Sequence, residues 1–335
     1  MAGAIAIPVR APQWVLTYQG VNITADISRM VLAITYSDRL DGCSGELEIE
    51  LEDHDKRWQG PWEPTEGDQV NLMIGYAGEL LLPCGDFQVD DLSLSGPPDI
   101  LQIRCLSTYI TPAMRTPNST GYESQTLGQI ASTIASKYGL TVVGASGPAN
   151  LTFARITQRQ ESDLAFLRRL AFAHNYDFTI RGKQLVFYSR TALEESAPVA
   201  TILRGDLLRF DFRLKTHKTY KAAEVSYQFP ETKHLLTQTI NAPADTPTGD
   251  TLKLVVRCEN GQQANLKAMS ALHSRNMVRA TATLTAVGAT VYAAGNNVTI
   301  SGFGFNDGTY LIQHARHHLE RTTGYTTELD VRRID

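Results

Sequence analysis

The chain has 335 residues, of which 42% are hydrophobic and 20% are charged, as in an ordinary globular protein of about two domains. This composition excludes a disordered chain or a coiled coil, and the formal net charge of -4 gives the protein no overall attraction to nucleic acid or anionic lipid. No run of residues approaches the roughly 18 apolar positions of a membrane-spanning helix.

The N-terminal segment and the cysteines indicate a protein that is made in a cytoplasm. The first residues contain a short apolar run without a preceding basic segment, which does not fit a secretory signal. Cys43, Cys84, Cys105 and Cys258 lie far apart and form no C-x-x-C pair, so they predict neither a zinc site nor a disulfide framework. We expect reduced thiols.

Residues 14–108 predict strands in close succession. Polar and apolar side chains alternate with period two, and Gly, Pro and Asp turns interrupt the runs at short intervals. This pattern is typical of an antiparallel barrel or sandwich. We assign residues 1–111 to a first β-barrel-like domain.

The strand predicted at residues 46–52 carries a carboxylate at every second position. Residues two apart on a strand share a face and lie about 6–7 Å apart, so the carboxylates form one row and the apolar side chains the opposite row. A glycosidase requires two carboxylates that face each other across a cleft, one of them desolvated. We therefore interpret these carboxylates as a solvated strand face, and we call them the acidic row: Glu46, Glu48, Glu50 and Glu52.

Two tryptophans follow in a loop rich in Pro and Gly. Trp58 and Trp62 could anchor a protein interface, because large aromatic side chains are often interface hot spots. They could equally cover the open end of a barrel. The sequence does not decide between these two roles.

Residues 112–200 predict a small α+β domain inserted after the first barrel. The stretch 111–121 is rich in Pro, Ser, Thr and Gly and is typical of a linker. Apolar side chains at three- and four-residue steps predict helices at 127–138 and 161–175. A hairpin is predicted at 176–189.

Residues 201–335 predict a second β-barrel-like domain with one flanking helix near residues 262–274. The strand predicted at residues 308–320, the last but one, carries His314, His317 and His318. On a strand, His317 and His318 face opposite ways, and His314 and His318 are about 13 Å apart, so the three cannot share one metal ion. We find no sequence motif of a catalytic, cofactor or metal site, and we expect no enzyme activity.

Three stretches together resemble one known family. The stretches are Ser95–Asp99, the helix Glu161–Leu170 followed by a Tyr-Asp-Phe strand, and the ending that contains Gly302, Asp307, Gly308, His317 and Gly324. Their order and spacing resemble the phage late control protein D family, which supplies the baseplate hub of contractile-tailed phages and related injection machines. The resemblance extends from about Leu40 to Ile334.

The resemblance implies a mainly β fold with two tail-tube-like β-barrels and an inserted α+β domain, assembled as a homotrimer. Six barrels in three copies would match a six-fold tail tube on one side and a three-fold spike on the other. The implied partners are the central spike, the tail tube or tube-initiator proteins, other baseplate proteins and the tape measure protein. The implied location is the tail baseplate of the virion, after synthesis in the host bacterial cytoplasm. Whether the first barrel includes strands from after the insert stays open.

A hub of this kind encloses a channel for DNA and the tape measure, and the acidic row could line it. Negative walls repel the phosphate backbone, so DNA would slide past rather than bind. The alternative function is a peptidoglycan hydrolase of the tail, because some hubs carry such domains. A transcriptional regulator would need a helix-turn-helix and a basic surface, neither of which the sequence predicts.

Overall fold

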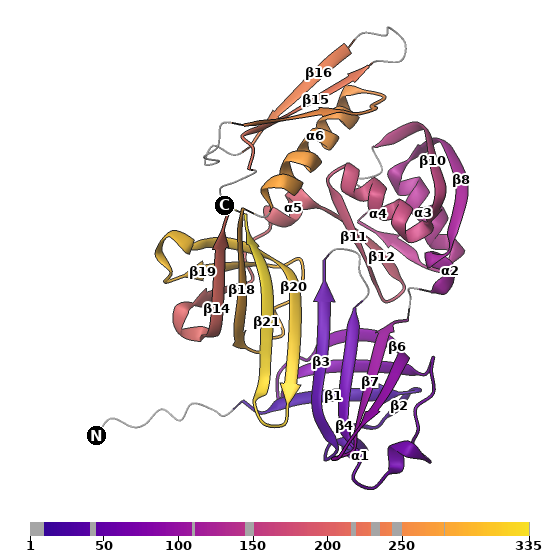
Figure 1. Ribbon diagram of the computed structural model, residues 1–335, viewed down its shortest axis with the longest axis vertical. Helices are drawn as coiled ribbons and strands as arrows, with labels where there is room; N and C mark the ends of the chain where they lie inside the picture. Colours follow the sequence, from indigo (N-terminus) through magenta and orange to yellow (C-terminus); the bar gives the residue numbers. More distant parts are fainter. Residues whose placement is uncertain are drawn as a thin grey trace.

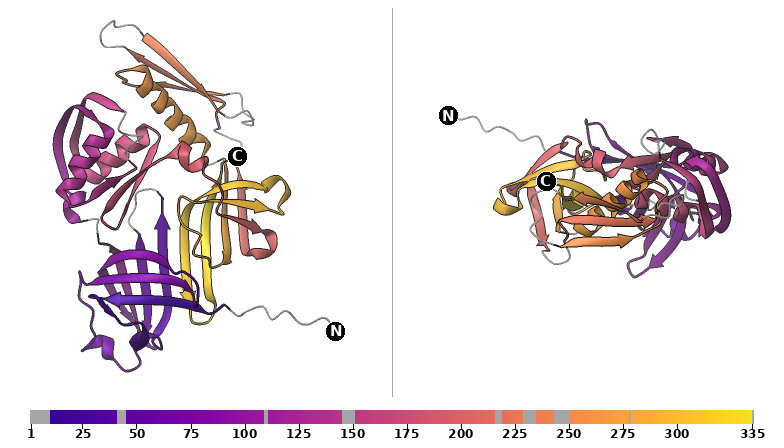
Figure 2. Two further views of the ribbon diagram at one scale, coloured as in Figure 1. Left: turned by 180° about the vertical axis from the view of Figure 1, so that it is seen from behind. Right: turned by 90° about the horizontal axis from the view of Figure 1, so that it is seen from above.

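The computed structural model describes residues 10–40, 45–108, 111–144, 151–215, 219–228, 235–242, 250–277 and 279–334. The fold is mainly β, as the sequence predicts. Figure 1 shows two curled groups of strands side by side, with most of the helices gathered above them, and Figure 2 shows the same arrangement from behind and from above.

The first barrel is built mainly from strands that precede the insert. Its alternation of side chains follows the sequence pattern: Leu47, Ile49 and Leu51 expose only 1% each and pack in the core. Burying one face of every strand is the main source of stability for such a barrel. The elements are β1 Pro12–Tyr18, β2 Val21–Asn22, α1 Thr24–Ile27, β3 Val31–Arg39, β4 Glu46–Glu52, η1 Arg57–Gln59, β5 Gln69–Tyr76, β6 Leu82–Ser95 and β7 Ile100–Ser107.

The second barrel is built from strands at the end of the chain. Its core contains Tyr310, Ile312, Leu329 and Val331, each at most 1% exposed. The elements are β13 Ala200–Leu203, η3 Arg204–Asp206, β14 Leu207–Leu214, β18 Ala280–Val287, β19 Asn297–Ser301, η4 Gly304–Asn306, β20 Gly308–Glu320 and β21 Gly324–Arg333.

The two barrels repeat one strand order. In the first barrel the strands lie in the order β3-β4-β7-β6-β5, and in the second they lie in the order β14-β18-β21-β20-β19. If the five strands of each barrel are numbered along the chain, both sheets place them side by side in the order first, second, fifth, fourth, third. Every neighbouring pair is antiparallel. The chain therefore contains the same five-strand unit twice, although no repeat of fixed period is evident in its sequence.

The hairpin β20–β21 belongs to both barrels. The first half of β20 pairs with β19, and residues 314–320 pair with β3 of the first barrel. Leu319 and Tyr325, close to the hairpin turn, pack in the core of the first barrel. The first barrel thus does include strands from after the insert, and the two barrels form one continuous sheet.

His317 lies fully buried where the two barrels meet. Its Nε2–H donates to the carbonyl oxygen of Tyr292 at 2.9 Å, and its Nδ1 accepts from the hydroxyl of Tyr325 at 2.8 Å. The ring stacks on Tyr36, which is its cross-strand partner on β3, with the ring centroids 5.9 Å apart. Burial lowers the pKa of His317 to about 4, so the neutral form occupies this position at neutral pH.

The described residues of the insert after the first barrel form two small sheets and four helices. Its strands pair as β8 with β10 and as β11-β12-β9. The segment 111–121, predicted to be a linker, instead forms α2 and the first half of β8, so that prediction is wrong. The elements are α2 Pro112–Arg115, β8 Pro117–Thr126, α3 Leu127–Lys137, β9 Thr141–Val143, β10 Thr152–Ser162, α4 Asp163–Ala173, β11 Tyr176–Arg181, β12 Gln184–Ser189 and α5 Arg190–Glu194.

A second group of elements interrupts the second barrel between β14 and β18. It is a three-stranded sheet covered by one long helix, with its own core around Val225 and Ala268. The elements are β15 Ala222–Gln228, β16 Leu235–Asn241, β17 Thr251–Val255 and α6 Gly261–Asn276. The helix confirms the one predicted near 262–274, whereas β16 was not predicted. The predicted domain limits, 1–111, 112–200 and 201–335, stay predictions. Among the described residues, no helix is long and apolar enough to cross a membrane.

The contact of His317 with both barrels predicts a large effect of its removal. In His317→Ala, the Tyr325 hydroxyl and the Tyr292 carbonyl lose their partner and a cavity opens, so we expect unfolding to require about 3 kcal/mol less free energy. The control is His318→Ala, since His318 is half-buried and contacts Thr35. Denaturant unfolding measures both, and equal losses would contradict a special role for His317.

Candidate assembly surfaces

The acidic row lies on the face of β4 that points away from the core. Glu46 is exposed, and Glu48, Glu50 and Glu52 are half-buried. The Gln102 side chain donates to Glu48, and Arg321 Nη1 lies 3.2 Å from Glu52 Oε2. The carboxylates therefore form one row on one strand, as the alternation predicts, and two of them have polar or cationic partners.

The two tryptophans occupy different environments. Trp58, on η1, is 8% exposed and packs in the core of the first barrel, and its backbone N–H donates to Asp53 Oδ1 at 3.2 Å. Trp62 is 37% exposed and meets Trp58 edge to face at 5.5 Å. Arg57 lies over the Trp62 ring at 5.2 Å. Trp58 thus belongs to the barrel end, while Trp62 offers part of its ring to solvent.

A cavity of about 380 Å³ lies beneath these tryptophans. Core side chains such as Leu16, Ile49 and Val89 form its floor, and Trp58 and Trp62 contribute to its wall. Its lining is largely apolar, with Asp26 and Glu63 as its two acidic members, so the cavity could hold an apolar group.

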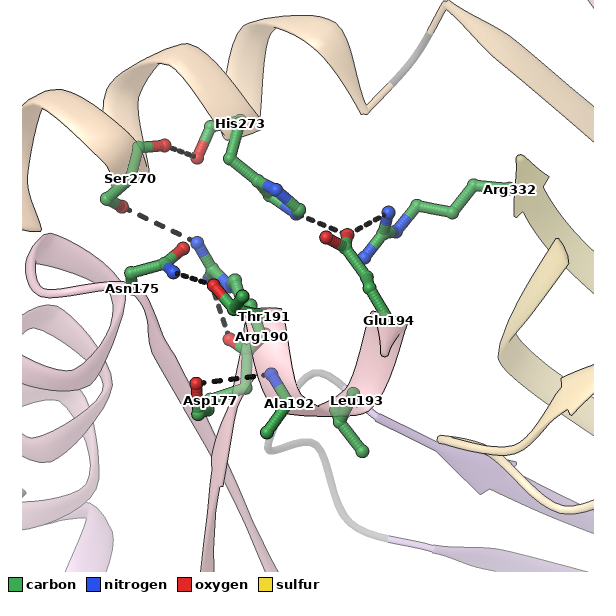
Figure 3. A network of polar contacts seen from close by, with 12 residues as sticks. Asn175, Asp177, Arg190, Thr191, Ala192, Leu193, Glu194, Ser270, His273 and Arg332 are labelled. Carbon is green, nitrogen blue, oxygen red and sulfur yellow. Dashed lines mark hydrogen bonds and ion pairs between the residues drawn. The ribbon is translucent and has the colours of Figure 1, made fainter. Parts of the chain in front are cut away.

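A network of buried polar side chains joins the inserts to the second barrel (Figure 3). Glu194, at the end of α5, meets Arg332 of β21 at 2.6 Å and His273 of α6 at 3.3 Å. The Arg332 side chain is only 5% exposed. One carboxylate therefore connects three elements that are far apart in the sequence, and we call this network the polar junction.

Arg190, at the start of α5, extends the polar junction toward the first insert (Figure 3). It forms two hydrogen bonds with Asp177, both of 2.7 Å, and its Nη1 donates to Ser270 Oγ at 3.5 Å. Its guanidinium also lies 4.3 Å from the centre of the Phe172 ring. Two-point pairing of this kind fixes the direction as well as the distance of a contact.

The charges of the polar junction influence one another. Burial raises the pKa of Glu194, while the Arg332 guanidinium acts in the opposite direction. Burial, together with Arg332 and Arg190, lowers the pKa of His273 to about 3. His273 is therefore neutral at neutral pH, and the contact at 2.6 Å with Arg332 favours an ionised Glu194. Sequence reasoning missed this site, because its members lie in separate segments and form no motif.

The second barrel ends in an apolar edge strand. No described strand pairs with the outer side of β14, whose only partner is β18. Leu208, Phe210 and Leu214 expose 64%, 41% and 56% of their surface. Long exposed edges with apolar side chains are rare in monomers, because they associate with other strands.

The first barrel has a corresponding open edge at the end of β6. Residues 82–88 of β6 pair with β5, but among the described strands residues 91–95 pair only with β7. Leu94 on this half is 48% exposed. The ends of β14 and β6 lie on opposite sides of the molecule (Figure 1).

Within the part of the chain that the structure describes, no group of three or more His, Cys, Asp or Glu side chains is placed to hold a metal ion. His317 points into the barrel contact, whereas His318 contacts Thr35 and His314 lies 3.5 Å from Asp330. Cys84, Cys105 and Cys258 are free and buried, and Cys43 lies outside the described residues.

Comparison with known proteins gives two curated relatives. The chain is 31% identical over 214 residues to the probable baseplate hub protein of Escherichia phage 186, and 29% identical over 213 residues to that of Escherichia phage P2. These matches cover 63% and 62% of this chain, and the chain spans about half (54%) of each relative. No family model matches the sequence.

Solved structures share the fold. A 43 kDa tail protein of prophage MuSo2 from Shewanella oneidensis matches with a TM-score of 0.71 and 17% identity, over 96% of this chain and 98% of its own. A component of the E. coli type VI secretion system, described as similar to the T4 tail proteins gp27 and gp5, matches with a TM-score of 0.58 and 12% identity, over 94% and 76%. The resemblance to baseplate hub proteins is therefore confirmed.

The polar junction predicts that Glu194 is needed for stability. In Glu194→Ala the buried Arg332 loses its carboxylate, so the free energy of unfolding should fall on the order of 3 kcal/mol. The matched control is Glu195→Ala, an exposed neighbour, for which we expect a change within about 0.5 kcal/mol. Thermal and denaturant unfolding measure the stability of both variants. A similar stability of Glu194→Ala and Glu195→Ala would contradict the role of Glu194 in the polar junction.

Proposed function

We propose that this chain is the structural hub of the baseplate of a contractile phage tail or tail-like particle. The observation that carries the proposal is its sequence relation to proteins named baseplate hub. The shared fold of tail proteins supports it. The hub would act by geometry: it would join neighbouring rings of the tail without performing a chemical reaction.

The hub would be a homotrimer that adapts one symmetry to another. Each chain contributes two barrels of the same strand order, so three chains supply six similar units. Six units fit a six-fold tail tube or its initiator proteins, while the three-fold axis fits the central spike. Contacts between unlike edges close into a ring when the rotation between copies is 120°.

The remaining partners follow from the same position in the virion. Other baseplate proteins would surround the ring, and the tape measure protein and DNA would pass through its channel. The acidic row would lie along this channel, where negative charge prevents a phosphate backbone from binding. Trp62 would contact a neighbouring baseplate protein through its exposed edge.

A peptidoglycan hydrolase is the alternative that the sequence leaves open. The acidic row does not favour it, because its carboxylates follow one strand face and do not oppose each other across a cleft. No other observation on the described residues favours a hydrolase.

The trimer is tested by mass. Light scattering of the purified protein, alone and with its spike protein, should give a particle of three chains of 36.9 kDa in at least one of the two samples. A monomer in both samples, at concentrations up to about 100 µM, would contradict the proposed assembly.

The two surface assignments are tested in assembled particles. Glu48→Lys with Glu50→Lys should slow DNA ejection without lowering particle yield, because the channel wall would then attract phosphate. Unchanged DNA ejection would contradict the place of the acidic row along the channel.

Trp62→Ala should lower the incorporation of neighbouring baseplate proteins while the melting temperature of the hub stays the same. Unchanged incorporation of baseplate proteins would contradict the contact through Trp62.

A further inference from the structure

A cleft of about 560 Å³ lies where the two inserts meet. One wall is formed by β10 and α4 of the first insert, and the other by α6 and the residues that precede it in the second insert. Figure 1 shows α4 and α6 next to each other above the barrels. The volume lies within the range of about 300–1,000 Å³ that is usual for a ligand site, and neither barrel contributes a described residue to the lining. We call this site the basic cleft.

Hydrogen bonds between the inserts fix the two walls of the basic cleft. The Gln263 side chain donates to the carbonyl oxygen of Thr152 at 3.0 Å, and the backbone N–H of Ala154 donates to Glu259 Oε2 at 2.8 Å. Gln263 is only 2% exposed. The folded chain itself therefore forms the site, and no ligand is needed to bring its walls together.

Basic side chains surround the basic cleft. Arg155 and Arg169 come from the first insert, and Arg257 and Lys267 come from the second. Glu259 is the one acidic side chain among the described residues of the lining. The whole chain has a formal net charge of -4, so this positive cluster is opposite in sign to the average of the protein.

Two of these cations have no carboxylate partner among the described residues. The Arg257 side chain is exposed, and Lys267 Nζ donates to a neutral group, the carbonyl oxygen of Arg257, at 2.5 Å. By contrast, Arg169 is paired with Glu161 at 2.5 Å. The ion pair of Arg155 joins two exposed side chains at 3.6 Å and contributes little. An anionic ligand would therefore meet Arg257 and Lys267 as uncompensated charges.

His174 belongs to the lining of the basic cleft and is 2% exposed. Its Nδ1–H donates to the carbonyl oxygen of Leu170 at 2.8 Å, so its Nε2 is an acceptor, and that atom has no hydrogen-bond partner among the described residues. Burial lowers the pKa of His174 to about 4, against the Leu170 carbonyl and together with Lys267 and Arg169. The positive field of these cations thus reaches the ring. Because buried acceptors normally have a donor, the lining offers a ligand one open acceptor besides its positive charges.

We propose that the basic cleft binds an acidic segment of a partner protein, in which carboxylates neighbour apolar side chains. Arg257 and Lys267 would pair with the carboxylates, and a backbone N–H of the segment would reach His174 Nε2 by a small shift of the lining side chains. Half-buried lining residues such as Ile156 and Ala173 would contact the apolar side chains of the segment. The inference goes beyond the proposed hub function, because the site is separate from both barrels.

A nucleic-acid strand fits the basic cleft less well than a peptide. Its phosphodiester backbone has no N–H group for His174, and single strands are usually bound by exposed aromatic rings on which the bases stack. Phe153 in the lining is 3% exposed and packs edge to face on His174, with the ring centroids 5.3 Å apart. The chemistry of the lining therefore favours an acidic peptide.

Binding of a defined probe tests the basic cleft. The probe is a fluorescein-labelled peptide of sequence Glu-Leu-Glu-Glu-Leu-Glu, and fluorescence anisotropy measures its binding to the full chain. We expect saturable binding with a dissociation constant below about 1 mM, which weakens as the salt concentration rises from about 50 to 500 mM because salt screens the charges. The control peptide has Gln in place of each Glu and should not bind. Absence of saturable binding of the acidic peptide, or equal binding of the control peptide, would overturn the proposal.

Charge reversal at one exposed residue tests the location of the site. Arg257→Glu should weaken binding of the acidic peptide at least about tenfold, because a carboxylate then repels the acids of the probe. Its melting temperature should stay the same, since the Arg257 side chain is exposed. The matched control is Arg275→Glu, an exposed arginine of α6 outside the lining, which should bind the peptide like the parent protein. Equal affinities of Arg257→Glu and Arg275→Glu would overturn the assignment to this cleft.

A fluorescein-labelled oligothymidine strand is the competing probe. We expect it to bind more weakly than the acidic peptide at the same salt concentration. Tighter binding of the oligonucleotide, lost in Arg257→Glu, would assign the basic cleft to nucleic acid and overturn the proposal of a peptide. These measurements are independent of the trimer, because the whole site lies within one chain.

Discussion

The structure depends on one constraint, the presence of a single hairpin in two hydrophobic cores. Along β20, Tyr310 and Ile312 are buried in the second barrel, whereas Leu319 is buried in the first. Residues 314–320 of the same strand are paired with β3 on one side and with β21 on the other. The barrels cannot rotate against each other unless this backbone pairing and the contacts of His317 are broken. A fixed angle between two similar units is what a closed ring of such units requires.

The inserts are attached to this frame by side-chain contacts, the polar junction and a small apolar cluster with Leu193 and Leu311, rather than by shared strands. The short helix α5 carries Arg190 at its start and Glu194 at its end, so one helix holds the first insert, α6 and the second barrel together (Figure 3). Charged pairs that are nearly removed from water are costly to break, and they also determine direction. The chain thus combines a rigid double barrel with inserts that are oriented by a few side chains.

The sequence predicts the local structure well where the pattern of side chains reports burial. The alternation in β4 places the acidic row outside and Leu47, Ile49 and Leu51 inside, as the structure does. The helices α3 and α4 follow from their apolar spacing. The segment 111–121 predicts a linker because β8 buries only Tyr122 fully, so its sequence shows no alternation of polar and apolar residues. The strand β16 was missed for the same reason.

Long-range pairing is not visible in such patterns. The repeated strand order is defined by which strands lie side by side, and the two units differ in most of their side chains, so no sequence period reveals it. The polar junction escapes prediction because it joins residues between 177 and 332 that share no motif. The resemblance to baseplate hub proteins supplied the architecture that the residues alone did not.

The ring itself can be observed directly by electron cryo-microscopy of the protein bound to its spike. The account predicts three chains that place six barrels in one ring around the spike. Any other number of chains in the ring, or barrels that lie outside it, would contradict the account.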